Sequence, residues 1–235
     1  TEPAPIPTQP ATESFREVVS YVLRTRTFRF LAPAVTLFNM SQLGILVWLP
    51  TFLVRVHGLD GAVMGLWFGI AIGAGGILGN LLGGHVADLM SRRGEQWYML
   101  IPMIAAFIEV PLTFTMVFSG TPEISIICFF FCGLFGYATF ASTTLAGIQI
   151  VKPHMRAVIT SLIFFCTTLI GLGAGPVIIG AISDLLAPRL GQKALAYALL
   201  VSPALHFLSA LMFLGGSRTI LRDSERALGQ AHAGS

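Results

Sequence analysis

Residues 62–87 have the sequence AVMGLWFGIAIGAGGILGNLLGGHVA, which contains no Asp, Glu, Lys or Arg. A helix rises about 1.5 Å per residue, so a stretch of this length crosses a hydrocarbon core of about 30 Å. Its apolar residues are not confined to one face, as they would be on a surface helix of a soluble protein. They also lack the alternation of a barrel strand. The stretch therefore predicts a transmembrane helix.

Five further stretches of the same kind lie on either side of it. Each of the six is about 20 to 28 residues long, which suits a membrane-spanning helix. Glu109 is the only Asp, Glu, Lys or Arg inside them. Charged residues make up 11% of the chain and hydrophobic residues 54%, which is not the balance of a soluble protein. We predict an all-α membrane protein whose six transmembrane helices form one bundle, at residues 30–54, 62–87, 98–118, 124–151, 157–183 and 194–217.

The basic residues are divided unevenly between the two sets of loops. Of the 14 Lys and Arg, all but Arg55, Arg189 and Lys193 lie before the first stretch, after the second, after the fourth or in the tail. The positive-inside rule then predicts that both termini are cytoplasmic, in agreement with an even number of helices. A net charge of +3 does not indicate nucleic-acid binding. We expect a multi-pass protein of the cell membrane, in a bacterium the inner membrane, with the lipid bilayer as its partner.

The segments outside the six helices divide the rest of the chain. Residues 1–13 are rich in proline and predict a disordered cytoplasmic linker. Because the chain begins with Thr1 rather than Met, we expect it to be the second part of a longer polypeptide. Residues 14–29 predict an amphipathic helix on the membrane surface, with an extension of the first span as the alternative. Residues 30–217 form the transmembrane domain and residues 218–235 a cytoplasmic tail.

No sequence pattern of a hydrolase, a nucleotide-binding loop or a metalloprotease is found in the chain. Cys128, Cys132 and Cys166 all lie inside apolar stretches, so they do not indicate a disulfide-rich domain. Cys128 and Cys132 share a helix face, but no His or Asp nearby completes a metal site, so we interpret them as packing residues. We expect no enzyme activity, no catalytic residue, no cofactor and no metal.

The loop after the second stretch, Gly84-His85-Val86-Ala87-Asp88-Leu89-Met90-Ser91-Arg92-Arg93, carries the clearest motif. Glycine there permits a close helix crossing, and Asp88 can meet an arginine or a helix N-terminus. The pattern resembles the Gly-x-x-x-Asp-Arg-x-Gly-Arg-Arg motif of the major facilitator superfamily. Leu89 and Ser91 replace the first arginine and the inner glycine, which suits the degenerate second copy of that motif. The alternative is an incidental aspartate in a basic loop.

A second resemblance lies in the fifth stretch, where Gly171, Gly175 and Pro176 match a Gly-x-x-x-Gly-Pro motif found in some superfamily members. Together the two motifs imply that residues from about 15 to 222 are the C-terminal six-helix half of a twelve-helix secondary transporter. Its partner would be the N-terminal half of the same polypeptide, and it would work by alternating access. An alternative of another class is a stand-alone six-helix channel subunit or membrane scaffold.

Smaller matches are similar to bacterial spinster-like transporters. They are Trp48 to Leu53, His57-Gly58, Arg156-Ala157, Gly171 to Pro176 and Ser183-Asp184. The resemblance implies transport of a lysolipid, a sphingoid lipid or another amphipathic small molecule, linked to protons. Organic-anion symporters of the same superfamily share the Trp-Leu-Pro feature and are the alternative.

The superfamily fold also implies where a substrate would bind, because the first, second, fourth and fifth helices of each half line its cavity. Polar side chains at membrane depth usually face protein or water. The candidates are Asn39, Gln42, Tyr137, Thr144, Thr167 and Thr168, with Trp48 against a lipid tail. For the threonines the alternative is a hydrogen bond to a carbonyl of their own helix.

Glu109 is the candidate proton site, because an ionisable residue inside a membrane span indicates function by default. The alternative is a protonated Glu109 that satisfies a helix backbone kinked by Pro102 and Pro111. For His206, in the sixth stretch, we expect a packing role.

Overall fold

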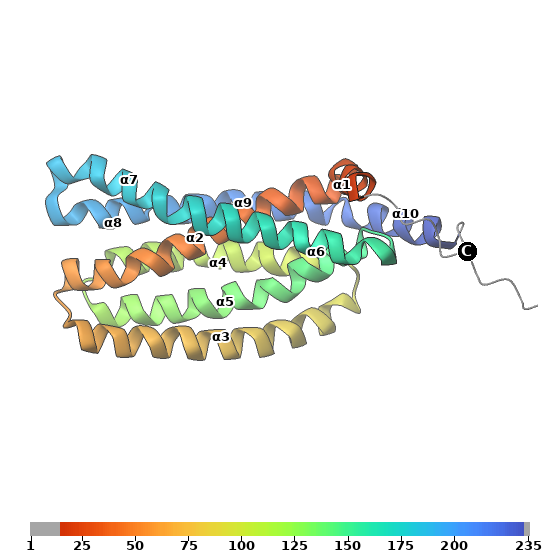
Figure 1. Cartoon of the computed structure of the whole chain (residues 1–235). Helices are drawn as coiled ribbons and strands as arrows, with labels where there is room; N and C mark the ends of the chain where they lie inside the picture. The colour runs from red at the N-terminus through yellow and green to blue at the C-terminus, as the bar shows by residue number, and fades with distance from the viewer. Residues whose placement is uncertain (1–14, 233–235) are drawn as a thin grey trace, which may run out of the picture.

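The computed structural model describes residues 15–232, and this part of the chain is built of helices without a strand (Figure 1). The predicted all-α class is confirmed. The predicted linker, residues 1–13, lies outside the described residues. The helices, including the 3-10 turns η1 and η3 and the π-helix η2, are α1 (Phe15–Arg24), α2 (Arg26–His57), α3 (Gly61–Ser91), α4 (Trp97–Phe118), α5 (Pro122–Gln149), η1 (Pro153–Met155), α6 (Arg156–Phe165), η2 (Cys166–Leu172), α7 (Gly173–Leu190), η3 (Gly191–Lys193), α8 (Ala194–Leu199), α9 (Val201–Ser217) and α10 (Ile220–His232).

Five helical stretches of the described chain are long and apolar enough to cross a membrane. The fifth, Pro153–Ser217, has 65 residues, far more than the roughly 20 that one crossing needs. It reverses direction at η3, where α7 and α8 meet side by side at one end of the bundle (Figure 1). The chain therefore passes six times along the bundle, as α2, α3, α4, α5, α6 to α7, and α8 to α9.

The turn between α2 and α3 follows from local sequence. Gly58 ends α2 in the left-handed region, with a φ of 69° that a side chain would disfavour. Two residues later Asp60 caps α3, because its carboxylate accepts hydrogen bonds from the backbone N–H groups of Ala62 at 2.9 Å and Val63 at 3.3 Å. These two residues fix where the first pass stops and the second begins.

Helix α3 packs on α5 through glycines spaced four residues apart. A side chain on Gly75 would come within 2.9 Å of the Phe130 carbonyl oxygen, and one on Gly83 would collide with Ala138. Such spacing lets two helices approach closely in a membrane. Gly83 makes the contact with α5, since it shares a helix face with Gly75 and Gly84 does not. A Cβ on Gly84 would meet no atom within 4 Å in the described chain, so its role in a close crossing stays a prediction.

Helix α2 lies in the middle of the bundle and contacts α5, α7, α9 and η2. Gly175 at the start of α7 sits directly against the backbone carbonyl of Met40, and a side chain on Gly171 would come within 3.0 Å of Asn39 Cβ. The glycines of the predicted Gly-Pro motif are therefore where the fifth pass approaches α2. The π-helix η2, with its wider turn, contains Gly171 and is itself part of this contact.

The described ends of the chain meet at one end of the bundle, where α1 and α10 lie (Figure 1). Thr25 separates α1 from α2. That α1 lies on the membrane surface stays a prediction. The outward faces are strongly apolar: on α3, Leu66, Ile77 and Leu81 are each more than 60% exposed. Surfaces of this kind suit lipid or another helix bundle rather than water.

Candidate functional site

A groove of about 410 Å³ runs between four passes of the bundle, α2, α3, α5 and α6. Asn39 and Gln42 enter it from the middle of α2, and Tyr137 enters it from α5. These are the three residues whose amide or phenol groups are hardest to explain as packing at membrane depth. The structure brings them together in one concave site.

The rest of the groove is mostly aromatic and aliphatic. The rings of Phe140 and Phe164 meet edge to face with centroids 5.5 Å apart, one from α5 and one from α6. Both rings, with Tyr137 and Asn80, belong to residues that are exposed, so the groove is open on this side. No Asp, Glu, Lys, Arg or His is among the residues that line it in the described chain. The groove suits a molecule with a long apolar part.

The amide of Gln42 links the groove to a buried polar cluster. Its Nε2 donates to the Cys132 carbonyl oxygen at 3.0 Å and to Glu109 Oε1 at 3.4 Å. Space for the amide comes from Gly136, because any side chain there would collide with Gln42 Nε2. Hydrogen bonds to α4 and α5 thus fix the amide of Gln42, while the side chain also lines the groove.

Glu109 in α4 and His206 in α9 form an ion pair in the bundle interior. Both side chains are fully buried, and Glu109 Oε2 lies 2.9 Å from His206 Nε2. The atoms are close, but they are not aligned as a hydrogen bond, so neither has a well-formed hydrogen-bond partner. The contact is an ion pair only when the imidazole is protonated and the carboxylate is ionised. The ring of His206 is also 3.4 Å from Ser41 Oγ through its Nδ1 and packs against Phe38.

These contacts go beyond the packing role expected for His206. They also place Glu109 one hydrogen bond away from the groove, although Glu109 does not line it. The sequence analysis considered the two residues separately. Two ionisable residues in different apolar spans are a signal that they pair, because each is costly in a membrane interior without the other.

The threonines among the candidates do not line the groove. Thr144 Oγ1 donates to the Phe140 carbonyl at 2.9 Å, and Thr167 Oγ1 donates to the Phe164 carbonyl at 3.0 Å. Both bonds are within one helical region, as the alternative for these hydroxyls supposed. Thr168 is exposed and is also outside the groove lining.

Trp48 lies at the contact between α2 and α7 rather than in the groove. Its Nε1 donates to the Pro176 carbonyl oxygen at 2.8 Å, and its ring would lie 2.8 Å from a Cβ on Gly180. Pro176, which cannot donate from its own backbone nitrogen, thereby serves as an acceptor between helices. Trp48 and the Gly-Pro motif form one interhelical contact.

Asp88 lies near the end of α3, exposed, as are Arg92 and Arg93. Within residues 15–232 its side chain makes no ion pair with either arginine. Its backbone carbonyl accepts a hydrogen bond from Ser91 Oγ at 2.9 Å. The contact of Asp88 with an arginine or a helix N-terminus stays a prediction.

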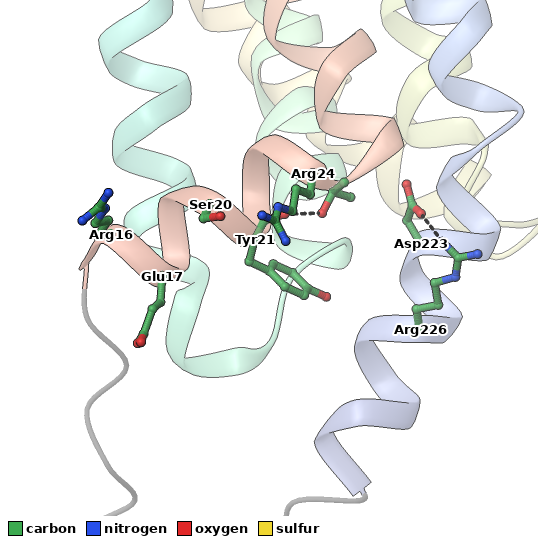
Figure 2. Close-up of a pocket in the computed structure, with 8 residues that line it drawn as sticks. Arg16, Glu17, Ser20, Tyr21, Arg24, Asp223 and Arg226 are labelled. Atoms are coloured by element: carbon green, nitrogen blue, oxygen red, sulfur yellow. Dashed lines mark hydrogen bonds and ion pairs between the residues drawn. The ribbon is translucent and has the colours of Figure 1, made fainter.

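A second hollow of about 560 Å³ lies at the end of the bundle, between α1 and α10 (Figure 2). Arg16, Glu17 and Arg24 line it from α1, and Asp223 and Arg226 line it from α10. It is larger than the groove. It is lined by charged residues of α1 and α10, however, and these two helices lie at the end of the bundle (Figure 1). Position and lining therefore favour the groove as the solute site.

The Asp223 side chain in this hollow caps α2, although the two are far apart in the sequence. Its Oδ2 accepts hydrogen bonds from Thr27 N and Thr27 Oγ1, both at 2.8 Å, across 196 residues of sequence. Thr25, the residue just before α2, makes no side-chain cap of its own. Asp223 thus satisfies a first-turn donor of α2 and ties α10 to it.

Comparison with known families now places the chain. The sequence model of the Major Facilitator Superfamily matches residues 1–176. The chain belongs to this superfamily. Residues 84–93 and the Gly-Pro motif, on which the resemblance was stated, are thus motifs of a superfamily member, and the chain is a multi-pass protein of the cell membrane.

Among curated superfamily relatives, an efflux pump of Mycolicibacterium smegmatis is 28% identical over 207 residues, which are 86% of this chain and 47% of the pump. Protein spinster homolog 3 of Danio rerio is 25% identical over 247 residues, 92% of this chain and 47% of that protein. The sphingosine-1-phosphate transporter SPNS2 of Xenopus tropicalis is 26% identical over 224 residues, 87% and 43%. The chain spans about half the length of these relatives. By their names the first is an efflux pump and the third is a transporter.

The superfamily fold is also found in solved structures. A bacterial homolog of the human lysosomal transporter Spinster, inward-facing and unoccupied, superposes with a TM-score of 0.80 at 19% identity, over 93% of this chain and 53% of that one. The occupied form gives 0.73 at 19% identity, over 85% and 50%. At this identity the likeness establishes the fold.

Two features of the groove were missed by sequence reasoning. Asn80, an amide within the second apolar stretch, lines the groove from α3. It carries the same signal as Asn39, a polar side chain at membrane depth, and could have been found by it. The aromatic lining carries no such signal, because phenylalanine occurs in every apolar stretch of this chain.

Proposed function

We propose that the chain is the C-terminal six-helix half of a twelve-helix secondary transporter, which moves an amphipathic small molecule across the membrane by alternating access. The observation that carries the proposal is the groove, where Asn39, Gln42 and Tyr137 meet among aromatic side chains at the middle of the passes. Ligand sites of secondary transporters lie near the bilayer midplane at the interface between repeats. A groove that is open on one side of a bundle suits such an interface.

The surface next to the groove supports a second bundle as the partner. Helix α3 is buried only along its small residues, which face α5, and its large side chains Leu66, Trp67 and Ile70 are at least half exposed. The N-terminal half of the same polypeptide would cover this face and close the groove. The uneven distribution of Lys and Arg supports cytoplasmic placement of both termini.

The substrate class follows from the apolar lining and from the relatives. Two of them are a spinster homolog and a sphingosine-1-phosphate transporter by name. We therefore assign to this chain a lysolipid, a sphingoid lipid or a similar single-chain amphiphile. Its tail would lie along Phe129, Phe140 and Phe164, and its head group near the amides.

Proton coupling is assigned to Glu109, with His206 as its partner. The pair is buried, and Gln42 connects it to the groove by the 3.4 Å hydrogen bond to Glu109 Oε1. A change in the charge of Glu109 would alter the position of Gln42, and with it the groove. Ionisable residues inside membrane spans commonly form proton relays in transporters.

The experiment is flux of a fluorescent lysophosphatidylethanolamine, a lysolipid with a primary amine, into liposomes that contain the full polypeptide. An imposed pH gradient is expected to drive the flux, and a protonophore should remove it. Glu109→Gln should leave downhill exchange of the lipid and abolish its dependence on the gradient. Ser161→Ala is the control, since Ser161 is exposed and bonds only its own helix at Ala157. Flux no faster than in empty liposomes would refute the transporter.

A further inference from the structure

The three amide side chains of the groove each donate to the backbone carbonyl of a residue that does not line it. Asn39 Nδ2 donates to the Val35 carbonyl oxygen at 2.8 Å, and Asn80 Nδ2 donates to the Gly76 carbonyl oxygen at 3.0 Å. Gln42 Nε2 donates to the Cys132 carbonyl oxygen at 3.0 Å. A backbone carbonyl can only accept a hydrogen bond, so in each case the partner must be the amide nitrogen and not the oxygen.

This fixes what each amide has left for a ligand. In Gln42 the nitrogen has a second acceptor, Glu109 Oε1, so both of its hydrogens are engaged. In all three amides both lone pairs of the oxygen are left without a hydrogen bond within the described chain. Acceptor sites therefore outnumber donor hydrogens among these side chains. The groove therefore favours a ligand group that donates hydrogen bonds.

The charge of the lining residues also favours a cation over an anion. The described groove has no arginine, lysine or histidine that would pair with a phosphate or a carboxylate. It has five aromatic residues, Phe38, Phe129, Tyr137, Phe140 and Phe164, whose ring faces attract cations. An anionic group would meet unshared oxygen lone pairs here without a compensating positive charge.

From this geometry we infer that the groove binds the protonated primary amine of a single-chain amphiphile, with the oxygens of Asn39, Gln42 and Asn80 as acceptors. A primary ammonium has three N–H donors, which equals the number of amide oxygens. The inference rests on the proposed transport function and names the head group that this half recognises. An anionic group elsewhere on the same molecule would have to be bound outside this groove.

The test compares three probes that share one tail and differ in the head group. Dodecylamine carries a positive charge with three donors, dodecyltrimethylammonium carries the same charge without a donor, and dodecyl phosphate is an anion. Binding to the full polypeptide in nanodiscs is measured by displacement of radiolabelled dodecylamine, with protein-free nanodiscs subtracted. We expect dodecylamine to bind about tenfold more tightly than dodecyltrimethylammonium, because hydrogen bonds to a charged group are worth more than neutral ones. Dodecyl phosphate should bind more weakly still.

Asn80→Leu provides the matched variant, since Asn80 is exposed and its replacement leaves the buried cluster intact. It should weaken dodecylamine about fivefold and leave dodecyltrimethylammonium unchanged. Asn80→Asp adds a negative charge at the same place and should strengthen both cations. Ser161→Ala, outside the groove, should change none of the three affinities. The comparison of probes on the unmodified protein does not depend on any variant folding.

Two outcomes would overturn the inference. One is dodecyl phosphate binding as tightly as dodecylamine. The other is Asn80→Leu weakening binding of the amine and of the trimethylammonium equally. That result would mean that the Asn80 oxygen accepts no hydrogen bond from the ammonium. In both cases gradient-driven flux of the fluorescent lysophosphatidylethanolamine would still stand, so only the head-group assignment fails. If the proposed function itself is wrong, that flux is absent as well.

Discussion

Two carboxylates are buried in this bundle, and their surroundings differ. Asp223, at the bundle end, is 5% exposed, and its Oδ2 accepts two hydrogen bonds of 2.8 Å from Thr27. Its Oδ1 lies 3.6 Å from Arg226. Glu109, in the middle, is fully buried, and its Oε1 has one bond of 3.4 Å from Gln42. Its Oε2 lies 2.9 Å from His206 without hydrogen-bond alignment.

The difference distinguishes a carboxylate that stabilises the fold from one that we assign to function. Asp223 has short, well-formed bonds to a backbone donor and a hydroxyl, so it has one stable state and serves as a helix cap. Glu109 has one long hydrogen bond and a close but unaligned contact with His206, in a low-dielectric interior where incomplete bonding is costly. A buried carboxylate with incomplete hydrogen bonding, next to a ligand groove, is more readily explained by function than by stability. Each of the following predictions tests this contrast.

The largest effect is expected from Glu109→Ala. It leaves His206 buried without its partner, and removing one member of a buried pair costs about 3–5 kcal/mol. Thermal unfolding in detergent measures the loss. Glu109→Leu combined with His206→Met should regain most of this stability, because a well-packed apolar pair avoids the cost of burying charge. A single variant as stable as the unmodified protein would show that the pair does not hold α4 to α9.

A smaller effect is expected from Asp223→Ala. The Thr27 N–H in the first turn of α2 loses its acceptor, which costs about 1–2 kcal/mol. Chemical unfolding measures the change, and Arg226→Ala on the same helix is the control. Arg226 is 68% exposed, so its loss should change stability by no more than about 1 kcal/mol. Equal losses in the two variants would contradict the capping role.

Ligand binding tests the groove beside Glu109. Alanine at Asn39, Gln42 or Tyr137 should each weaken binding of a lysolipid several-fold, since a hydrogen bond to a neutral partner is worth about 1 kcal/mol. Gln42→Ala should also change the pH dependence of binding, because Gln42 alone of the three contacts Glu109. Affinity measured in nanodiscs decides this, with Cys128→Ala as a variant expected to bind normally. Unchanged affinity at all three positions would refute the site.

The smallest effect on stability is expected at Asp88, an exposed carboxylate. Asp88→Asn should alter the free energy of unfolding by no more than about 0.5 kcal/mol, as is usual for exposed positions. We expect it to slow transport without changing substrate affinity, because the superfamily motif is assigned to conformational change rather than binding. Flux and affinity measured on the same preparation separate the two. Loss of binding in well-folded protein would count against this assignment.

The placement of the polar candidates shows which residues of the site can be predicted from sequence. Asn39, Gln42 and Tyr137 were identified because an amide or phenol in an apolar helix needs partners, and all three line the groove. For Thr144 the same reasoning left a bond to its own helix as the alternative, and this is the bond that the hydroxyl makes. A threonine has this local alternative and a glutamine at depth does not, so the sequence is more informative for the longer side chains.

The sequence by itself determined the membrane class, the six passes and the superfamily. Lipid requires every spanning segment to be apolar over a fixed length, and that requirement acts on each stretch independently of the others. The start of α3 and the end of α2 are equally local, since Asp60 and Gly58 act on neighbouring residues. Such properties can be obtained without knowing how the helices pack.

Only the tertiary structure decided which faces of the helices meet. Three contacts depend on how each helix is rotated about its axis: the pair of Glu109 with His206, the cap that Asp223 places on Thr27, and the approach of Gly83 to α5. Apolar side chains surround most of these helices, so hydrophobicity gives almost no information on rotation. Rotation is set by close approaches between helices, and those exist only once all six passes are assembled.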